Sequence, residues 1–399
     1  MTNLTSSNIF PPSEVDPVAT APVSDSAIHT LFLSEQDTID AGVTDMAACI
    51  DVMSETLALF SAGDYRMGGP RADAQGITMK FPAASGFSTM PLDAPDRRFA
   101  AMPAYLGGSV GMAGVKWYGS NVENKKRGWP RSIHLVVLSD PISGAPVAMM
   151  AGNLVSAYRT AAVPGVAARY FARDDATTLA LIGPGAMNTT STEAFVAARP
   201  GLREVRVYGR RRSSSEEFIA AQAPRYPSIE RWLVSDSIED AVRDADIISV
   251  AATSPSGSQH YPYIAESWLK PGAFVSLPAN VRFDEDFLVH RARKVTDSRR
   301  TFESWADGLP SPSHESLGMI GMAFVDLIRA GKLPATDVVD IGDVVAGTAP
   351  ARQADDQIVL FSFGGLPIED VAWGTHVYRT AVEKGIGTSL SFWDAPFLQ

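Results

Sequence analysis

The stretch from Thr178 to Arg212 has residue types and spacing that could bind the pyrophosphate of a dinucleotide. A short apolar run leads into the turn Gly183-Pro184-Gly185, small residues follow, and a second apolar run ends at Gly209. Strand, glycine turn, helix and strand is the order of a dinucleotide-binding βαβ unit, in which the helix N-terminus offers N–H groups and a positive dipole end. A lone glycine turn is common elsewhere, and Asn188 replaces the usual third glycine or alanine, so the order of the elements carries this prediction.

The end of the second strand indicates which dinucleotide is bound. NAD-binding proteins usually place Asp or Glu there, about 20 residues after the glycines, to hold the ribose 2′-hydroxyl. This sequence has Arg210-Arg211-Arg212-Ser213 instead. Guanidinium groups and a hydroxyl suit a 2′-phosphate, although the same residues could form a solvated basic turn. We therefore expect NADP to be preferred, with NAD as the alternative.

The composition narrows the classes of function. The chain has 399 residues, enough for two domains, with 45% hydrophobic and 20% charged residues as in ordinary globular proteins. A net charge of -11 argues against nucleic-acid binding, which needs a basic surface. The one cysteine, Cys49, excludes a disulfide framework, and the six histidines lack metal-ligand spacing, so we expect no metal. Without a membrane-spanning run or a secretory pattern at the N-terminus, we expect no membrane contact and a cytoplasmic protein.

The elements around the turn predict a protein of the α/β class. Alternating strands and helices after Thr178 predict a Rossmann doubly wound parallel sheet, and the mixed strands before it predict an N-terminal α+β domain. We expect a flexible tail over residues 1–28, an α+β domain over 29–152, a dinucleotide-binding domain over 153–364, and a C-terminal helix over 365–399.

Three longer helices can be placed from their patterns. Apolar residues at helical spacing predict a helix over 43–62 that ends at Gly63. An alanine-rich stretch predicts a helix over 153–173, which Pro164 and Gly165 should kink or split. The last helix is expected over 368–384.

Five motifs occur in an order that is characteristic of one protein family. They are GVKWYGS at 114–120, DPISGAP at 140–146, SAYRTAAV at 156–163, ARQADDQ at 351–357 and GGLPIED at 364–370. With these motifs the chain resembles the ornithine cyclodeaminase/μ-crystallin family over roughly residues 31–387. Residues 42–46, 63–70 and 96–99 are similar to a longer branch of that family, which is associated with tyramine oxidase.

The resemblance implies both an architecture and a reaction. The first domain would bind substrate and form a homodimer, and the final helix would return to it. A hydride would move between the nicotinamide and a carbon bearing nitrogen in a small amino acid, imine or amine. Two other functions stay open: a cyclodeaminase, which is an ammonia lyase that recycles its NAD internally, and an NADPH-binding accessory protein of the μ-crystallin type.

The resemblance also assigns residues to the substrate. Lys116 matches the family's active-site lysine, and Arg159 matches the arginine that opens the interdomain helix, so both are expected to hold a substrate carboxylate. A lysine partly removed from water would have a lowered pKa and could exchange protons with an amine or imine. Arg66 is expected as a third carboxylate-binding residue, with Arg71 as the alternative.

Asn280 occupies the position of the family's catalytic aspartate. Asparagine cannot act as a base but can orient a water or an amine, which disfavours ornithine cyclisation. Asp284 could substitute only if the loop is shifted, and we favour a helix N-terminus there; Arg97 and Arg98 could serve either the dimer interface or the substrate. The expected cofactor contacts are Thr160, Gly183, Gly185, Ala186, Met187, Arg210, Arg211, Ser213, Ala252 and Thr253.

Overall fold

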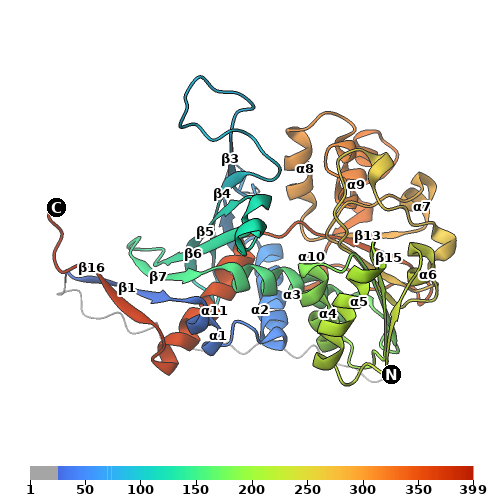
Figure 1. The fold of residues 1–399 in the computed structure, drawn as a ribbon, viewed down its shortest axis with the longest axis horizontal. Coiled ribbons are helices and arrows are strands. Elements are labelled where there is room, and N and C mark those ends of the chain that lie inside the picture. Colours follow the sequence, from blue (N-terminus) through green and yellow to red (C-terminus); the bar gives the residue numbers. More distant parts are fainter. Residues whose placement is uncertain (1–25, 70, 73, 399) are drawn as a thin grey trace, which may run out of the picture.

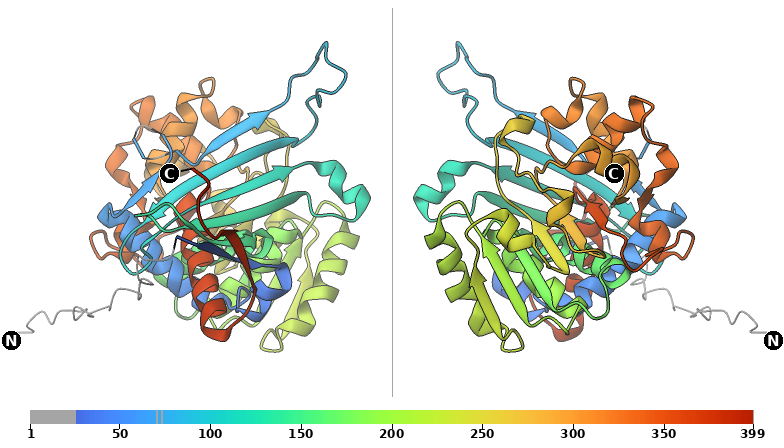
Figure 2. Two further views of the ribbon diagram at one scale, coloured as in Figure 1. Left: turned by 90° about the vertical axis from the view of Figure 1, so that its left-hand side faces the viewer. Right: turned by 90° about the vertical axis from the view of Figure 1, so that its right-hand side faces the viewer.

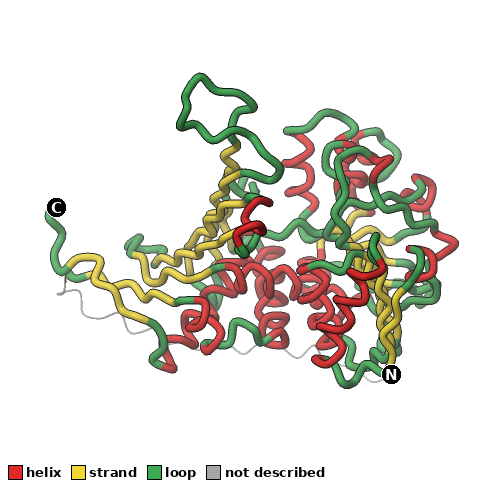
Figure 3. The backbone as a smooth tube through the Cα atoms, in the orientation of Figure 1, coloured by secondary structure: helices red, strands yellow, loops and turns green. Residues whose placement is uncertain are grey.

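Two β-sheets stand on opposite sides of the molecule, with a layer of helices between them (Figure 1). Figure 3 shows the same arrangement by colour, with strands of the first sheet on the left, strands of the second on the right and helices in the middle. The structure, a computed structural model, describes residues 26–69, 71–72 and 74–398. Most of the tail expected over residues 1–28 therefore lies outside the described residues.

The first sheet is largely antiparallel and belongs to the N-terminal part of the chain. Its strands are β1 (Ile28–Leu33), β2 (Tyr65–Met67), β3 (Ile77–Lys80), β4 (Arg98–Leu106), β5 (Met112–Ser120), β6 (Ser132–Ser139), β7 (Pro146–Ala151) and β16 (Thr388–Trp393). Their order is β16-β1-β7-β6-β5-β4-β2, with β3 paired to β4, and β1 runs parallel to β7. Successive side chains alternate between the faces, so Lys116 lies on the buried face and Trp117 on the outer face.

The second sheet is fully parallel. Its strands are β8 (Thr178–Ile182), β9 (Glu204–Tyr208), β10 (Arg231–Val234), β11 (Ile247–Val250), β12 (Phe274–Leu277), β13 (Arg293–Thr296), β14 (Val338–Asp340) and β15 (Val359–Ser362). The order is β10-β9-β8-β11-β12-β15-β13-β14, and every pairing is parallel. The strand order reverses between β8 and β11, which is where open sheets of this kind bind dinucleotides. The expected fold class, a Rossmann sheet with a second α+β domain, is confirmed.

The helices that matter for function lie between the sheets. The helices are α1 (Glu35–Asp40), α2 (Met46–Ala62), α3 (Asn153–Phe171), α4 (Ala186–Ala198), α5 (Arg212–Gln222), α6 (Ile238–Val242), α7 (Glu285–His290), α8 (Arg299–Asp307), α9 (Ile320–Arg329), α10 (Ile341–Val345) and α11 (Pro367–Lys384). One hydrophobic core runs from the first sheet through α2, α3 and α11 to the second sheet. In the left-hand view of Figure 2 these helices lie behind the first sheet, so the other face of that sheet is turned outward. Within the described part of the chain, no helix is long and apolar enough to cross a membrane.

Of two predicted helices, one forms as expected and the other differs from expectation. The helix over 43–62 forms as α2, whose N-cap Asp45 accepts the N–H of Ala48 and whose end at Gly63 is left-handed. Pro164 and Gly165 were expected to kink or split the next helix, and the predicted split was wrong, because α3 runs through both without a break. Both are buried, and a Cβ at Gly165 would lie 2.9 Å from Ile50 of α2. The glycine is there because neighbouring helices pack closely against α3.

The C-terminal segment forms the predicted helix and, after it, an additional strand. α11 packs against β4 and β5 of the first sheet, as the family resemblance implied. The chain then forms β16, a strand that was not predicted and that pairs antiparallel with β1 at the edge of the sheet. Its side chains are exposed on both faces, so it lacks the alternation that makes a strand recognisable from sequence.

Candidate active site

Four charged side chains from three elements meet behind the first sheet. Lys116 comes from β5, Arg159 from α3, and Glu369 and Asp370 from the first turn of α11. Nζ of Lys116 lies 2.7 Å from Oδ2 of Asp370, in ion contact but outside favourable hydrogen-bond angles. Arg159 donates from Nε to Oδ1 of Asp370 at 3.0 Å and from Nη1 to Oε2 of Glu369 at 2.6 Å. All four are buried, and two positive and two negative charges balance, which is the condition under which buried charges are tolerated. We call this group the charge cluster.

Burial and mutual attraction set the protonation of the charge cluster. Burial, with the neighbouring Arg159 charge, lowers the pKa of Lys116 to about 8, although Asp370 opposes the shift. Burial also works against the charged form of Arg159, but the carboxylates of Asp370 and Glu369 outweigh it and raise the Arg159 pKa. Burial raises the pKa of Glu369, whereas Arg159 and Lys116 overcome burial and hold the pKa of Asp370 below its ordinary value. Lys116 is therefore the member that can exchange a proton just above neutral pH.

A glycine turn before α11 fixes the position of Arg159. A Cβ at Gly365, whose φ is +80°, would lie 2.3 Å from Nη1 of Arg159, so only glycine fits. Oδ2 of Asp297 accepts the N–H groups of Gly364 and Gly365 at 2.7 and 2.8 Å. Nε2 of Gln75, from the first domain, donates to the carbonyl oxygens of the same two residues at 3.0 and 2.9 Å. Residues of both domains thus form hydrogen bonds to the glycine turn, which packs closely against Arg159 of the charge cluster.

The glycine turn after β8 has the geometry of a phosphate-binding turn. Gly183 has a φ of +97°, and a Cβ there would lie 2.8 Å from the backbone of Ala252, so the close approach of two strand ends requires glycine. Gly185 is the N-cap of α4, which has no side-chain cap and begins at Ala186. The first N–H groups of α4, including that of the partly exposed Met187, are therefore available to an anion. These residues fit the pyrophosphate of a dinucleotide.

Asn188 has a structural role that replaces the third glycine of the fingerprint. Its side chain is fully buried and donates to the carbonyl oxygens of Ile182 and Gly183 at 3.3 and 2.8 Å. Its amide oxygen accepts the hydroxyl of Ser249 in β11 at 2.7 Å. The usual small residue allows a helix to touch the strands, whereas here an amide joins helix α4 to β8 and β11 by hydrogen bonds.

The arginines after β9 divide into two groups. Arg212 is ion-paired with Glu216 and Asp236 at 3.1 and 2.7 Å. Arg210 and Arg211 are exposed, and no ion pair of either lies among the described residues. Together with the exposed Ser213, they follow the strand next to the glycine turn, where the adenosine ribose of a dinucleotide lies in such folds.

The other predicted site residues are placed as follows. Ala252 and Thr253 follow β11, beside Gly183. Thr160 lies on α3, where its hydroxyl donates to the carbonyl of Ser156 at 2.7 Å. Asn280 follows β12 and donates from Nδ2 to the hydroxyl of Ser254 at 3.3 Å, which ties it to the loop after β11. Asp284 is the N-cap residue of α7, the helix N-terminal position we favoured for it.

The structure does not bring Arg66 to the charge cluster. Arg66 pairs with Tyr105 in β2 and β4, on the face of the sheet opposite to Lys116, and its guanidinium donates to the carbonyl of Tyr65. Arg71 forms an ion pair with Asp307 of α8 at 3.4 Å. Of the two alternatives, Arg71 is the one that reaches toward the dinucleotide-binding domain.

Sequence reasoning missed the acidic half of the charge cluster and the residues that support it. Glu369 and Asp370 stand in the motif that carried the resemblance, but nothing local showed that they lie against Lys116 and Arg159. Two adjacent acids in the first turn of a helix are common, because they suit the helix dipole. The available signal was the charge balance, since two buried cations require two anions.

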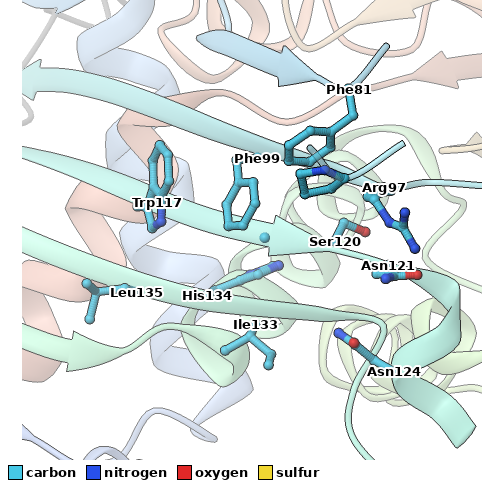
Figure 4. Close-up of a pocket in the computed structure, with 12 residues that line it drawn as sticks. Phe81, Arg97, Phe99, Trp117, Ser120, Asn121, Asn124, Ile133, His134 and Leu135 are labelled. Atoms are coloured by element: carbon cyan, nitrogen blue, oxygen red, sulfur yellow. The ribbon is translucent and has the colours of Figure 1, made fainter. Parts of the chain in front are cut away.

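A cavity of about 710 Å³ lies away from the charge cluster, on the outer face of the first sheet. Figure 4 shows the aromatic rings of Phe99 and Trp117 and the side chains of Ile133 and Leu135 around it, with Phe81 above. Trp117 and Ile133 are 41% and 49% exposed. The cavity is therefore mostly apolar, with Arg97, Asn121 and His134 on its polar side, and no member of the charge cluster lines it.

Comparisons with known proteins decide the family. The model of the Ornithine cyclodeaminase/mu-crystallin family matches residues 42–385. The chain belongs to that family. The predicted resemblance is thereby confirmed, while membership of the branch associated with tyramine oxidase stays a prediction.

Individual relatives have low sequence identity to this chain but align with most of it. The N-((2S)-2-amino-2-carboxyethyl)-L-glutamate dehydrogenase of Staphylococcus aureus is 27% identical over 298 residues, which cover 74% of this chain and 82% of the relative. The alanine dehydrogenase of Archaeoglobus fulgidus is 28% identical over 298 residues, covering 73% and 83%. A solved Delta(1)-pyrroline-2-carboxylate reductase of Thermococcus litoralis, in complex with NADH and L-proline, has a TM-score of 0.71 at 23% identity, covering 90% of this chain and 100% of that one. This last likeness supports the fold.

Proposed function

We propose that the protein is a nicotinamide-dependent oxidoreductase that transfers a hydride at a carbon–nitrogen centre of an amino acid or imine. The observation that carries the proposal is that Lys116 and Arg159 are buried together and share the carboxylate of Asp370, in a chain that also has a phosphate-binding turn. Both named relatives are dehydrogenases of an amino acid or an amino-acid adduct.

The charge cluster supplies the acid-binding and proton-transfer functions. Nε and Nη1 of Arg159 are held by Asp370 and Glu369. Nη2, which makes no hydrogen bond among the described residues, is therefore the group that can meet a substrate carboxylate, and Lys116 lies beside Arg159. When bound, the nicotinamide supplies or accepts the hydride. With a pKa of about 8, Lys116 is protonated at neutral pH and can give its proton to an imine nitrogen, which makes the neighbouring carbon a better hydride acceptor.

A substrate carboxylate would add one negative charge to a balanced cluster. Asp297 lies next to this cluster, and burial together with the Glu369 charge raises its pKa to about 7. A protonated Asp297 lowers the negative charge near the site without removing any residue. We infer that this carboxyl group allows the cluster to accept an acidic substrate near neutral pH.

NADP is the cofactor that the exposed arginines favour. Arg210 and Arg211 have no carboxylate partner among the described residues, whereas a 2′-phosphate would provide two or more acceptor oxygens. An NAD site would be expected to have a carboxylate at this position. We propose a preference for NADP over NAD.

A two-fold pairing through the outer face of the first sheet would account for its exposed apolar residues. Trp117, Ile133 and the apolar cavity beside them form a continuous surface on that face. We propose a homodimer, and one solved relative of the fold is an archaeal alanine dehydrogenase dimer. Light scattering on the wild-type protein and on Trp117→Glu would test this, since a monomeric wild type contradicts it.

The activity test is a screen of 2-oxo acids mixed with amines, in which oxidation of NADPH is followed by absorbance. Turnover above the protein-free rate, lost in Lys116→Met and kept in the surface control Lys125→Met, supports the proposal. NADPH binding without turnover on any mixture contradicts it. Formation of proline from ornithine without added reductant would favour the cyclodeaminase alternative, which Asn280 disfavours.

A further inference from the structure

A second positively charged position lies on the same face of the first sheet as Lys116. Alternate residues of β5 share a face, so Lys116, Tyr118 and Ser120 point to the same side. In the pairing of β5 with β4, Arg98 lies opposite Ser120 and Ala100 lies opposite Tyr118. Arg98 is therefore four residues along the strand from Lys116, and because their charged groups lie 5.8 and 5.9 Å from the ring centre of Tyr118, these groups are at most about 12 Å apart.

This second position has more positive than negative charge. Asp96 is ion-paired with both Arg98 and Arg131, and the Arg131 contact joins Nε to Oδ2 at 3.2 Å. The same Asp96 oxygen also accepts the hydroxyl of Ser120 at 2.7 Å. Two guanidinium groups thus share one carboxylate, unlike the balanced charge cluster. Their side chains are 30% and 54% exposed, so a ligand can reach them.

The local backbone holds these side chains in place. Asp96 has a left-handed φ of +58°, in a turn closed by the N–H of Arg97 to the carbonyl of Ala94. The carbonyl of Arg131 accepts the N–H of Asn121 at 2.9 Å and Nδ2 of Asn124 at 3.3 Å. Hydrogen-bonded turns at the ends of β4, β5 and β6 therefore fix the positions of Arg98 and Arg131.

The side chains of Tyr118 and His134, both neutral, lie between the two charged positions. The ring centre of Tyr118 is 5.9 Å from Nζ of Lys116 and 5.8 Å from the guanidinium carbon of Arg98. His134 lies 5.0 Å from the same ring, and its buried Nδ1 has no hydrogen-bond partner among the described residues. Burial and the Lys116 charge lower the pKa of His134 to about 4, so it is neutral at physiological pH. A flat ring and an uncharged nitrogen suit the carbon chain that joins the two ends of an extended polar ligand.

We propose that Arg98 and Arg131 form a second acid-binding position, and that the substrate is an imine or secondary amine with a carboxylate at each end. One carboxylate binds at Lys116 and Arg159, and the distal one binds at Arg98 and Arg131. Two amino-acid units span about 7 Å, and a charge contact of about 3 Å at each end gives a length comparable with the separation of the two charged groups. This inference rests on the proposed reaction, since it names the substrate class of the same site.

The test compares two imines that differ at one end. One forms from pyruvate and 4-aminobutanoate, and the other from pyruvate and 4-aminobutanamide, which has the same length without the distal charge. The diacid is expected to have a kcat/KM at least tenfold higher, through a lower KM. Arg98→Met and Arg131→Met should each reduce this ratio at least fivefold, whereas Arg127→Met, in the same loop and stacked on Trp129, should leave it unchanged. Equal kcat/KM for the two imines, or an unchanged ratio in both variants, would overturn the inference.

A binding measurement separates this inference from the reaction itself. If no imine is turned over, the proposed function fails, but the stable secondary amines made by reducing both imines can still be titrated by calorimetry with NADP present. A dissociation constant at least tenfold lower for the diacid, lost in Arg98→Met and kept in Arg127→Met, supports the second acid-binding position. Equal affinity, or no binding of either amine, contradicts it. NADP affinity and melting temperature, unchanged in Arg131→Met, would show that this variant is folded.

Discussion

The charge cluster and the turn over residues 209–213 after β9, which we call the nucleotide turn, contain ionic groups under opposite conditions. In the cluster, Lys116 and Arg159 are buried and each faces a carboxylate that lies more than 200 residues further along the chain. In the turn, Arg210 and Arg211 are adjacent, exposed and without a protein counter-charge among the described residues. The charges of the cluster therefore contribute to the stability of the fold as well as to the proposed chemistry, whereas the exposed arginines can act on a ligand without a stabilising role. Substitutions in the cluster should change stability and activity together, and substitutions of the exposed arginines should change affinity alone.

Removing Arg159 is expected to have the largest effect. Arg159→Met leaves Glu369 and half of Asp370 uncompensated in the core, and breaking a buried pair in this way costs about 3–5 kcal/mol. Urea unfolding followed by circular dichroism measures the change in the free energy of unfolding. Adding Glu369→Gln to the same chain should recover part of the loss, because it removes one of the orphaned charges. A loss below about 1 kcal/mol would mean that the cluster is more hydrated than its burial indicates.

Removing Lys116 should cost activity more than stability. Each variant removes one positive charge, but in Lys116→Met both carboxylates keep their hydrogen bonds to Arg159, so fewer buried contacts are lost than in Arg159→Met. Loss of a general acid typically lowers the rate by about 10²–10⁴-fold, and the kcat/KM of NADPH oxidation with an imine measures this. A fall of less than about tenfold would show that another group, or water, donates the proton.

The lowered pKa of Lys116 predicts in which direction activity and stability each change with pH. Because it is lowered from 10.5 to about 8, wild-type kcat/KM should decline above pH 8, as the proton that the imine needs is lost. Stability should change in the opposite direction. Between pH 8 and 10.5 the unfolded lysine keeps its proton while the folded one has lost it, so the wild type gains stability relative to Lys116→Met as the pH rises.

The contrast between the two regions also explains what could be predicted from sequence. The turn at Gly183 and the sheet around it were predictable, because strand, glycine and helix signals are local. Lys116 and Arg159 were found through motifs, but their pairing with Glu369 and Asp370 required the fold that brings β5, α3 and α11 together. The split at Pro164 was wrong for the same reason, since packing of α3 between α2 and α4 overrides a local helix breaker.

In the nucleotide turn, substitutions should affect the choice of cofactor and leave the fold intact. Arg211→Ser, and to a similar extent Arg210→Ser, should raise the KM for NADPH by about 10–100-fold, because a hydrogen bond between charged groups contributes about 1.5–3 kcal/mol. The KM for NADH should change little, and stability should stay within about 0.5 kcal/mol. Arg212→Ser is the matched control, since Arg212 is already paired with Glu216 and Asp236 and should matter less. Equal changes for both cofactors in Arg211→Ser would contradict a 2′-phosphate role.

Asn188 offers the smallest effect, and it tests whether a local pattern or the tertiary contact decides this position. Asn188→Ala introduces the residue type that the fingerprint usually has, so the pattern alone predicts no harm or a gain. The structure predicts a loss of about 1–3 kcal/mol in the free energy of unfolding, because the buried hydroxyl of Ser249 loses its acceptor and the carbonyl of Gly183 keeps only the N–H of Gly185. Adding Ser249→Ala should recover part of that loss by removing one unsatisfied group. If Asn188→Ala proves as stable as the wild type, α4 is held to the sheet by apolar packing, and the hydrogen bonds of this amide add nothing to it.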